Sequence, residues 1–540
     1  MSENTLPLTH IWGKYMAGAA HHNQINLYNA TERNYKMYEG DQWYGMPKGE
    51  LLPCHNVIKP TVQYKTSMVA MNTMQIMFSP MEYTPESVAV CEMLNKYAAQ
   101  KWEQLKLDSL SWRVILDAAI AGDSYLLFYD KALHCHLVQN TDIYFADEQE
   151  KDIQRQPYII IAERKPIETI RKEAKANGLS KKDIANIVPD NVDPTTIGDR
   201  AEVNTSDENG GKATSLLYLT KNEDGNVVMA RATRTVIYQP ETEIKKMKLY
   251  PVASYIWGAQ LNSSRGTGEV KPLIPNQLEL NKLLARRCNS AAQTAFAKPV
   301  YMKNQIANPD DVTKLGAAIE VKGNGTVQDI HNSFGYISPA PMSQEASLLQ
   351  NDLLVNSREL AGAGSAALGQ IDPRRASGDA IMAVVDQAAI PMNMPTAAYR
   401  QFVEDVAHIF LQFWRVYAKD TEGLETSYIE RDYNGRQVIV KKHADPEDLN
   451  TEMSIKIDAT ATNPYSRLAE ERTLEQFLQG KLINFEEYVD MLPYGSNAPK
   501  AALTKIIENR QRQQQLQMLM GAPMQSTGGP AVDNTLPGIG

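Results

Sequence analysis

Two helical patterns joined by a segment of small residues, within residues 344–420, place the strongest constraint on the fold of this chain. The first pattern repeats apolar residues up to Leu360 at spacings typical of a helix with one apolar face. Its apolar residues are Leu348, Leu349, Leu353, Val355 and Leu360. We therefore predict an amphipathic helix that ends at Ala361 and Gly362.

The segment after this helix, residues 361–375, contains three glycines, one proline and almost no large side chains. Such a segment cannot bury a core, and we expect a mobile loop. A second helix should begin at Ser377, whose hydroxyl can cap its first turn. Pro391 and Pro395 interrupt that pattern and predict a kink, after which the helix resumes. The apolar residues of the resumed helix are Phe402, Val406, Phe410, Phe413 and Tyr417.

The remaining patterns predict an α+β protein. Helical periodicity occurs at residues 23–38, after Pro60, and at residues 87–107, 110–121, 167–176 and 272–297. Strands are predicted at residues 125–129, 158–161, 426–432, 436–441 and 452–459, and a hairpin at 215–220 and 227–238. Residues 189–212 indicate a polar exposed loop, residues 298–341 a small β-containing excursion between two helices, and residues from 467 further helices.

Composition excludes several classes of protein. The 540 residues are 43% hydrophobic, enough for a sizeable core, and show neither a transmembrane stretch nor a secretory signal pattern. The four cysteines are widely spaced, as expected of reduced thiols in a cytosol: Cys54, Cys91, Cys135 and Cys288. The net charge of −9 argues against a simple DNA-binding module, although it is compatible with a channel through which DNA must slide.

Motifs for enzymatic chemistry are lacking. Gly211 and Lys212 do not complete a phosphate-binding loop, because Ser206 stands where its first glycine should be. Gly362 and Gly364 begin a GxG pattern that lacks a preceding strand, so a flexible loop is favoured over a dinucleotide site. The alternating His134-Cys135-His136, with Cys54 and His55 as further candidates, is a weak metal pattern. We expect no catalytic residues, no cofactor and no resident metal.

Three stretches, in the same order as in a known family, resemble the portal proteins of tailed bacteriophages. The first is Tyr38-Glu39-Gly40-Asp41-Gln42-Trp43 followed by Asn56-Val57-Ile58-Lys59-Pro60, which is similar to the amino-terminal portal signature. The second runs from Gly266-Thr267-Gly268-Glu269-Val270 through Leu273-Ile274-Pro275-Asn276-Gln277 to Asn281-Lys282 and is similar to the start of the portal stem. The third is Ala376-Ser377-Gly378-Asp379-Ala380-Ile381, between a small-residue loop and a proline-interrupted helix.

The resemblance implies a portal fold with an α/β wing, a helical stem, a small β-containing clip, a kinked tunnel helix and a helical crown. Its implied boundaries are 1–265 for the amino-terminal wing, 266–297 and 342–360 for two stem helices, 298–341 for the clip, 361–376 for the tunnel loop, 377–466 for the kinked helix and carboxy-terminal wing, 467–520 for the crown, and 521–540 for a disordered tail.

The function implied by the resemblance is that of a ring of about twelve copies at one capsid vertex, through which double-stranded DNA is packaged and later ejected. The implied partners are further copies of the chain, the passing DNA, a large terminase, the major capsid and scaffolding proteins, and head-completion or adaptor proteins, with no membrane. The implied location is the virion, after assembly in the host cytoplasm. The alternative class is a DNA-processing enzyme, a nuclease or ATPase of a mobile element.

Three groups of residues are candidates for contact with DNA or partners. The tunnel-loop candidates are Gly362, Gly364, Ser365, Gly369, Arg374 and Arg375. Lys282 and Arg286, four residues apart on the predicted stem helix, can point into a channel and contact phosphates, or form ion pairs with neighbouring subunits. The candidates for docking at the clip are Gly323, Asn324, Gly325 and Asp329.

Overall fold

The computed structural model describes residues 8–43, 52–190, 211–294, 344–360, 390–417, 425–431, 437–443 and 453–461, together with short parts of 298–337 and 474–489. The chain divides into two units, Met1–Thr460 and Ala461–Gly540. In the second unit the structure describes a short helix at residues 474–479 and further helical residues at 485, 488 and 489. Most of the predicted crown and the whole carboxy-terminal tail lie outside the described residues.

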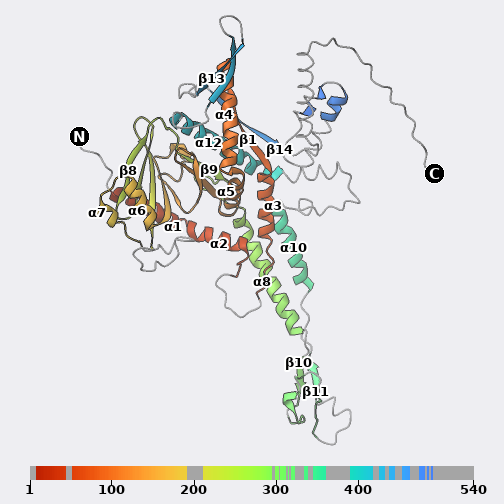
Figure 1. The fold of residues 1–540 in the computed structure, drawn as a ribbon. Coiled ribbons are helices and arrows are strands. Elements are labelled where there is room, and N and C mark those ends of the chain that lie inside the picture. Colours follow the sequence, from red (N-terminus) through yellow and green to blue (C-terminus); the bar gives the residue numbers. More distant parts are fainter. Residues whose placement is uncertain are drawn as a thin grey trace, which may run out of the picture. The chain divides into compact units, whose positions relative to one another are not determined.

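Five helices make up the amino-terminal part of the first unit (Figure 1): α1 (Leu8–Gln24), α2 (Leu27–Glu39), α3 (Ile58–Ala70), α4 (Pro85–Gln104) and α5 (Leu107–Ala121). Local capping explains several of their ends. Thr84 and Ser87 form a capping box at the start of α4, and α2 ends where Gly40 adopts a φ of 102°. The prediction of one helix over residues 23–38 was wrong at its start, because Asn26 has a left-handed backbone that separates α1 from α2.

Two antiparallel sheets follow. The smaller has the order β3-β2-β9 and contains β2 (Asp123–Tyr129), β3 (His134–Gln139) and β9 (Val252–Ile256). The larger has the sequential order β4-β5-β6-β7-β8 and contains β4 (Ile143–Phe145), β5 (Tyr158–Pro166), β6 (Lys212–Lys221), β7 (Val227–Ala232) and β8 (Ile237–Ile244). Helices α6 (Ile167–Ala176) and α7 (Lys181–Ala185) follow β5. The helix predicted at 167–176 is confirmed with the same bounds.

The single strand predicted at residues 227–238 was wrong. The structure contains two strands there, β7 and β8, joined by a tight turn in which Thr233 N donates to Val236 O at 2.8 Å. The residues between the two strands, Thr233, Arg234, Thr235 and Val236, include no Gly, Pro, Asn or Asp, so no typical turn residue marks the connection.

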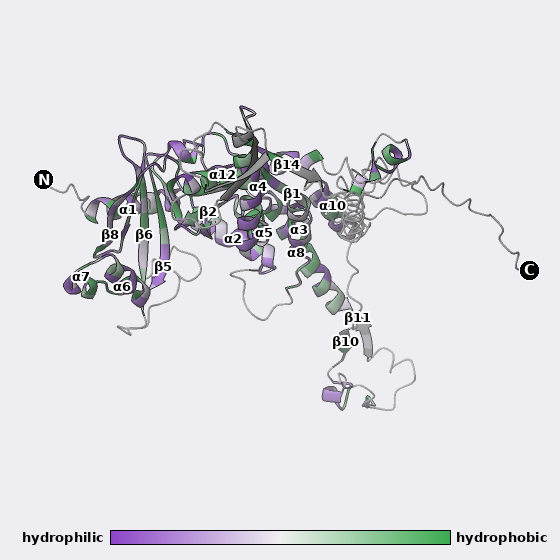
Figure 2. Cartoon of the chain, turned by 45° about the horizontal axis from the view of Figure 1, so that its top comes forward, coloured by the Kyte–Doolittle hydropathy of each residue, from purple (hydrophilic) through white to green (hydrophobic). Residues whose placement is uncertain are grey.

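The main core joins segments from both ends of the first unit. Helix α12 (Asn393–Tyr417) lies against β9, and its aromatic residues contact the sheet and β1 (Asn72–Pro80): Phe128 with Phe410, Tyr255 with Tyr399, and Phe78 with Trp414. Strand β1 pairs with β14 (Met453–Ala461). The helices in Figure 2 carry both hydrophobic and hydrophilic residues, as expected of elements that bury one side.

Helix α12 begins at Asn393, so Pro395 does not interrupt the helix as predicted. The predicted apolar residues Phe402, Val406, Phe410 and Phe413 are buried. Pro391 lies in a 3₁₀ turn, Ile390–Met392, and Pro395 in the first turn of α12. Both positions suit proline, because the first turn of a helix leaves its N–H groups unpaired. The helix predicted from Ser377 to Pro391 lies almost entirely outside the described residues, so the kink stays a prediction.

Two long helices, α8 (Val270–Thr294) and α10 (Gln344–Leu360), lie side by side (Figure 1). The chain between them contains β10 (Lys298–Tyr301) and β11 (Phe334–Ile337), which pair antiparallel. The predicted hairpin near residue 434 is also present, as β12 (Glu425–Arg431) and β13 (Gln437–His443). Among the described residues, no helix is both long enough and apolar enough to cross a bilayer.

Helix α10 departs from the prediction in one respect. Its apolar residues are not all covered by the chain, since Leu348 is 62% exposed, Leu349 50% and Val355 49%. The amphipathic pattern therefore has an apolar part without a partner in the described part of this single chain.

Candidate functional site

The start of α8 is held against α5 by glycines. Gly266 and Gly268 pass so close to the end of α5 that a Cβ on either would overlap a backbone carbonyl, that of Gly122 for Gly266 and that of Ile120 for Gly268. Glu269 N donates to Ala119 O at 2.7 Å. The Gly-Thr-Gly motif is therefore required by close backbone packing, which only glycine permits.

A buried ion pair joins the same segment to α3. Lys65 Nζ lies 2.5 Å from Glu269 Oε1, with side-chain exposures of 7% and 14%. Trp257 Nε1 donates to the other carboxylate oxygen at 3.3 Å. Both oxygens of Glu269 thus have donors, which a buried carboxylate requires.

The next two turns of α8 hold the amino-terminal motif through amide side chains, at a site that we call the α8 junction (Gln42, His55, Val57, Gln277 and Asn281). Asn281 Nδ2 donates to Gln42 Oε1 at 2.5 Å, and its Oδ1 accepts from His55 N at 3.2 Å. Gln277 donates to His55 O at 2.7 Å and accepts from Val57 N at 2.9 Å.

The α8 junction explains why two of the three motifs occur together. Gln42 follows the Gly-Asp of the first motif, and Gln277 and Asn281 end the second. In the fold they are hydrogen-bonded across more than two hundred residues of sequence. Trp43 donates its indole N–H to Pro53 O at 3.2 Å, which makes it a local anchor of this loop.

A second buried polar group, the arginine cluster (His22, Asp123, Glu148 and Arg265), lies just before the glycines. Arg265 donates to both carboxylate oxygens of Glu148 at 2.9 Å, to Asn140 O and Ile143 O, and to His22 Nε2 at 2.9 Å. Asp123 Oδ2 lies 3.5 Å from the same guanidinium. The guanidinium thus lies among six acceptor atoms from five residues, which fixes where α8 begins.

The electrostatics of the arginine cluster follow from burial and charge. Burial lowers the pKa of His22 to about 4, so this imidazole is neutral at pH 7 and accepts from Arg265. Burial by itself would raise the pKa of Glu148, but Arg265 and the neighbouring donors hold it well below its usual range. The cluster places one cation between two carboxyl groups, each of which it contacts, and it has the character of a structural site rather than a reactive one.

The stem candidates lie further along α8. Lys282 Nζ contacts Glu279 Oε1 at 2.6 Å on the same helix, and Arg286 is exposed. Arg287, the residue after Arg286, donates to Gln350 Oε1 of α10. Whether Lys282 and Arg286 contact DNA stays a prediction. The tunnel-loop and clip candidates all lie outside the described residues.

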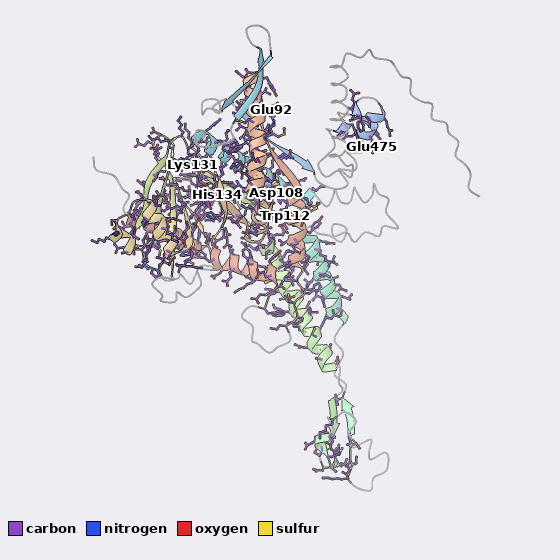
Figure 3. All side chains as sticks on the ribbon, viewed as in Figure 1. Glu92, Asp108, Trp112, Lys131, His134 and Glu475 are labelled. Carbon is purple, nitrogen blue, oxygen red and sulfur yellow. The ribbon has the colours of Figure 1, made fainter. Side chains whose placement is uncertain are left out.

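The histidine pattern has another structural use. His134 and His136 share one face of β3, as expected, and both rings lie near Tyr129 (His134 is labelled in Figure 3). His134 Nδ1 lies 2.7 Å from Asp130, and His136 Nε2 lies 2.7 Å from Glu163. Within the described residues, no group of three or more His, Cys, Asp or Glu side chains is arranged to hold a metal ion.

Sequence reasoning missed the arginine cluster and the α8 junction as contacts. The signal for the arginine cluster was Arg265 directly before Gly266 and Gly268. Glycines that allow close backbone packing place the neighbouring arginine inside the protein, where it needs buried acceptors. The signal for the second was the pair Gln277 and Asn281, four residues apart on an otherwise apolar helix face.

The sequence model of the family described as Phage P22-like portal protein matches residues 203–468 of this chain. The matched region includes Arg265, the glycines, α8, α10 and α12. The chain is a portal protein of a tailed bacteriophage, a structural component of the capsid that serves DNA packaging. The search of curated proteins gave no match.

Proposed function

We propose that about twelve copies of this chain form a ring at one capsid vertex and that double-stranded DNA passes through its central channel during packaging and ejection. The observation that carries this proposal is the antiparallel pair of α8 and α10, which is continuous with a β pair at one end and is hydrogen-bonded to the body of the unit at the other. This is the arrangement expected of a stem that joins a wing to a clip.

The proposed ring has no enzymatic activity of its own, and a separate terminase drives the DNA. Within it we assign residues 1–265 and 377–466 to the wing, 266–297 and 342–360 to the stem, 298–341 to the clip, 361–376 to the tunnel loop and 467–520 to the crown. The long-range contacts of α12 and β14 with β9 and β1 support a wing built from both ends of this range. Assembly would occur in the host cytoplasm, with capsid and scaffolding proteins as partners.

The experiment that tests the proposal is the mass of the native particle together with DNA packaging. Purified protein is expected to form a closed ring by mass photometry and negative-stain electron microscopy, and procapsids carrying it should protect DNA from nuclease when terminase and ATP are added. Protein that stays monomeric or dimeric in the presence of scaffold and capsid protein would contradict the proposal. Procapsids made without this chain are the control.

The tunnel loop is proposed to contact DNA through Gly362, Gly364, Ser365, Gly369, Arg374 and Arg375. Replacing Gly362 and Gly364 with valine would restrict the backbone and add bulk near the channel axis. We expect packaging to fall strongly while ring assembly and the thermal midpoint change little. Packaging at the wild-type level by the double variant would show that the loop is a passive connection.

The clip is proposed to dock the terminase and the adaptor proteins, with Gly323, Asn324, Gly325 and Asp329 at its surface. Three residues separate α8 from β10 and six separate β11 from α10, so the β pair must follow the stem closely. Substitutions in residues 323–329 should weaken terminase binding and leave ring assembly intact. Normal terminase binding and packaging after such changes would exclude these residues from docking.

A further inference from the structure

One face of α10 alternates acidic and apolar side chains. Glu345, Leu348, Asp352, Val355 and Glu359 are spaced by three or four positions, so they form one stripe along the helix, which we call the α10 stripe. All five residues are exposed, including 62% of Leu348 and 49% of Val355. Exposed apolar residues flanked by polar ones mark a surface that a partner can cover, and the carboxylates of this stripe suit a partner of positive charge.

The α10 stripe does not face α8 of the same chain. Gln350, which accepts from Arg287, and the buried Ser357 mark the side of α10 that faces inward. At 100° per residue, the residues of the α10 stripe lie on the opposite side of the helix. Among the described residues, α8 of the same chain therefore does not cover Leu348, Asp352 and Val355.

A complementary stripe runs along α8. Lys282, Arg286 and Asn289 are spaced by four and three positions, with Arg286 and Asn289 exposed and the side chain of Lys282 44% exposed. Arg287 marks the side of α8 that faces α10, and this set, the α8 stripe, lies roughly 100° to 160° around the helix from it. It presents the cation of Arg286, with Asn289 on one side and, on the other, Lys282, which is paired with Glu279 of the same helix.

The two stripes also match in position along the helices. The chain runs out along α8 and back along α10, and the Arg287–Gln350 contact fixes which residues lie level. Counting about 1.5 Å per residue from that contact, Arg286 is level with Asp352 to within about 1.5 Å, and Lys282 lies between Asp352 and Glu359. In a ring whose axis runs along these helices, rotation from one copy to the next does not change a residue's height along the axis. Residues at the same height in one chain are therefore at the same height in neighbouring chains.

We propose that the α10 stripe of one copy binds the α8 stripe of a second copy of this chain, with Asp352 of one copy paired to Arg286 of the next. The contact joins two different surfaces, so it can repeat from copy to copy, and it forms a ring when the rotation between copies closes. The proposal rests on the ring proposed above and names the contact that forms it. It assigns Lys282 and Arg286 to the interface between subunits and not to the channel wall. Ion pairs with neighbouring subunits were one of the two alternatives that the sequence left open for these residues.

Charge exchange tests the proposal. Arg286→Glu and Asp352→Arg place like charges opposite each other when made singly and restore opposite charges when combined. Each single variant is expected to raise the protein concentration at half assembly by about tenfold or more, and the double variant to recover most of that loss. The readout is mass photometry over a concentration series, with the thermal midpoint of the monomer as the check on folding. Because both residues are exposed, that midpoint should stay unchanged.

Two further variants sharpen the test. Leu348→Gln removes the apolar part of the α10 stripe without reversing a charge, and it should also weaken assembly. Lys175→Glu makes the same change of charge as Arg286→Glu at an exposed position of α6, and it should assemble as the wild type does.

The outcomes separate this proposal from the ring itself. Wild-type protein that forms rings while both single variants assemble equally well would overturn the contact and leave the ring standing. Arg286→Glu rings that assemble normally and package less DNA would also overturn it and return Arg286 to the channel. Wild-type protein that forms no ring would overturn the proposed function itself.

Discussion

Arg265 illustrates how one buried side chain fixes the start of α8. The residue is only 4% exposed. Its guanidinium contacts Glu148, Asp123, His22 and two backbone carbonyls. Replacing Arg265 with methionine would leave two carboxylates buried without their cation, and we expect a loss of about 3–5 kcal/mol in the free energy of unfolding.

Urea denaturation of Arg265→Met measures this loss. The matched control is Arg155→Met, because Arg155 has a side chain that is 75% exposed and lies 3.4 Å from Asp152. The control should change the free energy of unfolding by less than about 0.5 kcal/mol. Equal shifts in the two variants would contradict the role assigned to the arginine cluster.

Asp405 on α12 should make stability depend on pH. Burial raises its pKa to about 6, from 3.8 in the unfolded chain, and Glu404 and Asp152 add to the effect. The folded protein therefore holds a proton between pH 4 and 6 that the unfolded chain releases, so this group's contribution falls as the pH rises through that window. We expect Asp405→Asn to raise the free energy of unfolding at pH 7 by about 1–2 kcal/mol and to change little at pH 4.

Urea titrations at both pH values check this prediction, with Asp310→Asn at an exposed position as the control. A gain of the same size at pH 4 and pH 7 would mean that the effect of Asp405→Asn is not electrostatic.

At the level of single residues, sequence reasoning identified types and spacings but few contacts. The motif glycines and the amides Gln42, Gln277 and Asn281 lay within the stretches that carried the family resemblance. The hydrogen bonds between them were not predictable, because they join residues that only the complete fold brings together.

At the level of elements, the start of α8 makes a clear prediction about backbone packing. Gly268→Ala would place a Cβ against the carbonyl oxygens of Ala119 and Ile120, neither of which can move without distorting α5. We expect a destabilisation of about 1–3 kcal/mol, as for other overpacked sites. Thermal unfolding of the purified variant is the measurement.

Gly13→Ala in α1 is the matched control. Nothing lies within 4 Å of the added Cβ, and alanine is favoured over glycine inside a helix by about 0.5–1 kcal/mol. The two glycine-to-alanine changes should therefore have opposite signs. If Gly268→Ala were neutral, the close approach of α8 to α5 would not be what requires this glycine.

The elements differed in how well sequence predicted them. The bounds of α6 and the buried positions of α12 were predicted well from their 3.6-residue periodicity, whereas three of the apolar residues predicted for α10 are exposed. Helix α1 and strand β1 were not predicted. Strand β1 has the sequence NTMQIMFSP, whose alternation is weak, and its partner β14 lies at the far end of the unit. Periodicity reports which side of an element is buried and cannot report which distant element covers it.

At the scale of the whole molecule, we predict that the end of the chain is dispensable for assembly. Residues 521–540 are rich in glycine and proline and contain few large apolar residues, so they offer little surface for burial. Deleting them should leave ring formation unchanged and shift the free energy of unfolding by less than about 0.5 kcal/mol. Mass photometry and thermal unfolding of the truncated chain measure both, with the full chain as the control. A collapse in soluble yield would show that this segment docks on the protein.

The pairing of β1 with β14 has a consequence for synthesis in the infected cell. Roughly 370 residues separate the two strands in the sequence. At ribosomal speeds of about 5–20 residues per second, β1 waits about 20–75 s before its partner emerges. During that interval the edge of β1 offers unpaired backbone groups to any nascent chain on the same polysome, which is the situation in which aggregation competes with folding. Production of this protein should therefore depend on host chaperones that bind nascent chains, more than its stability after completion would suggest.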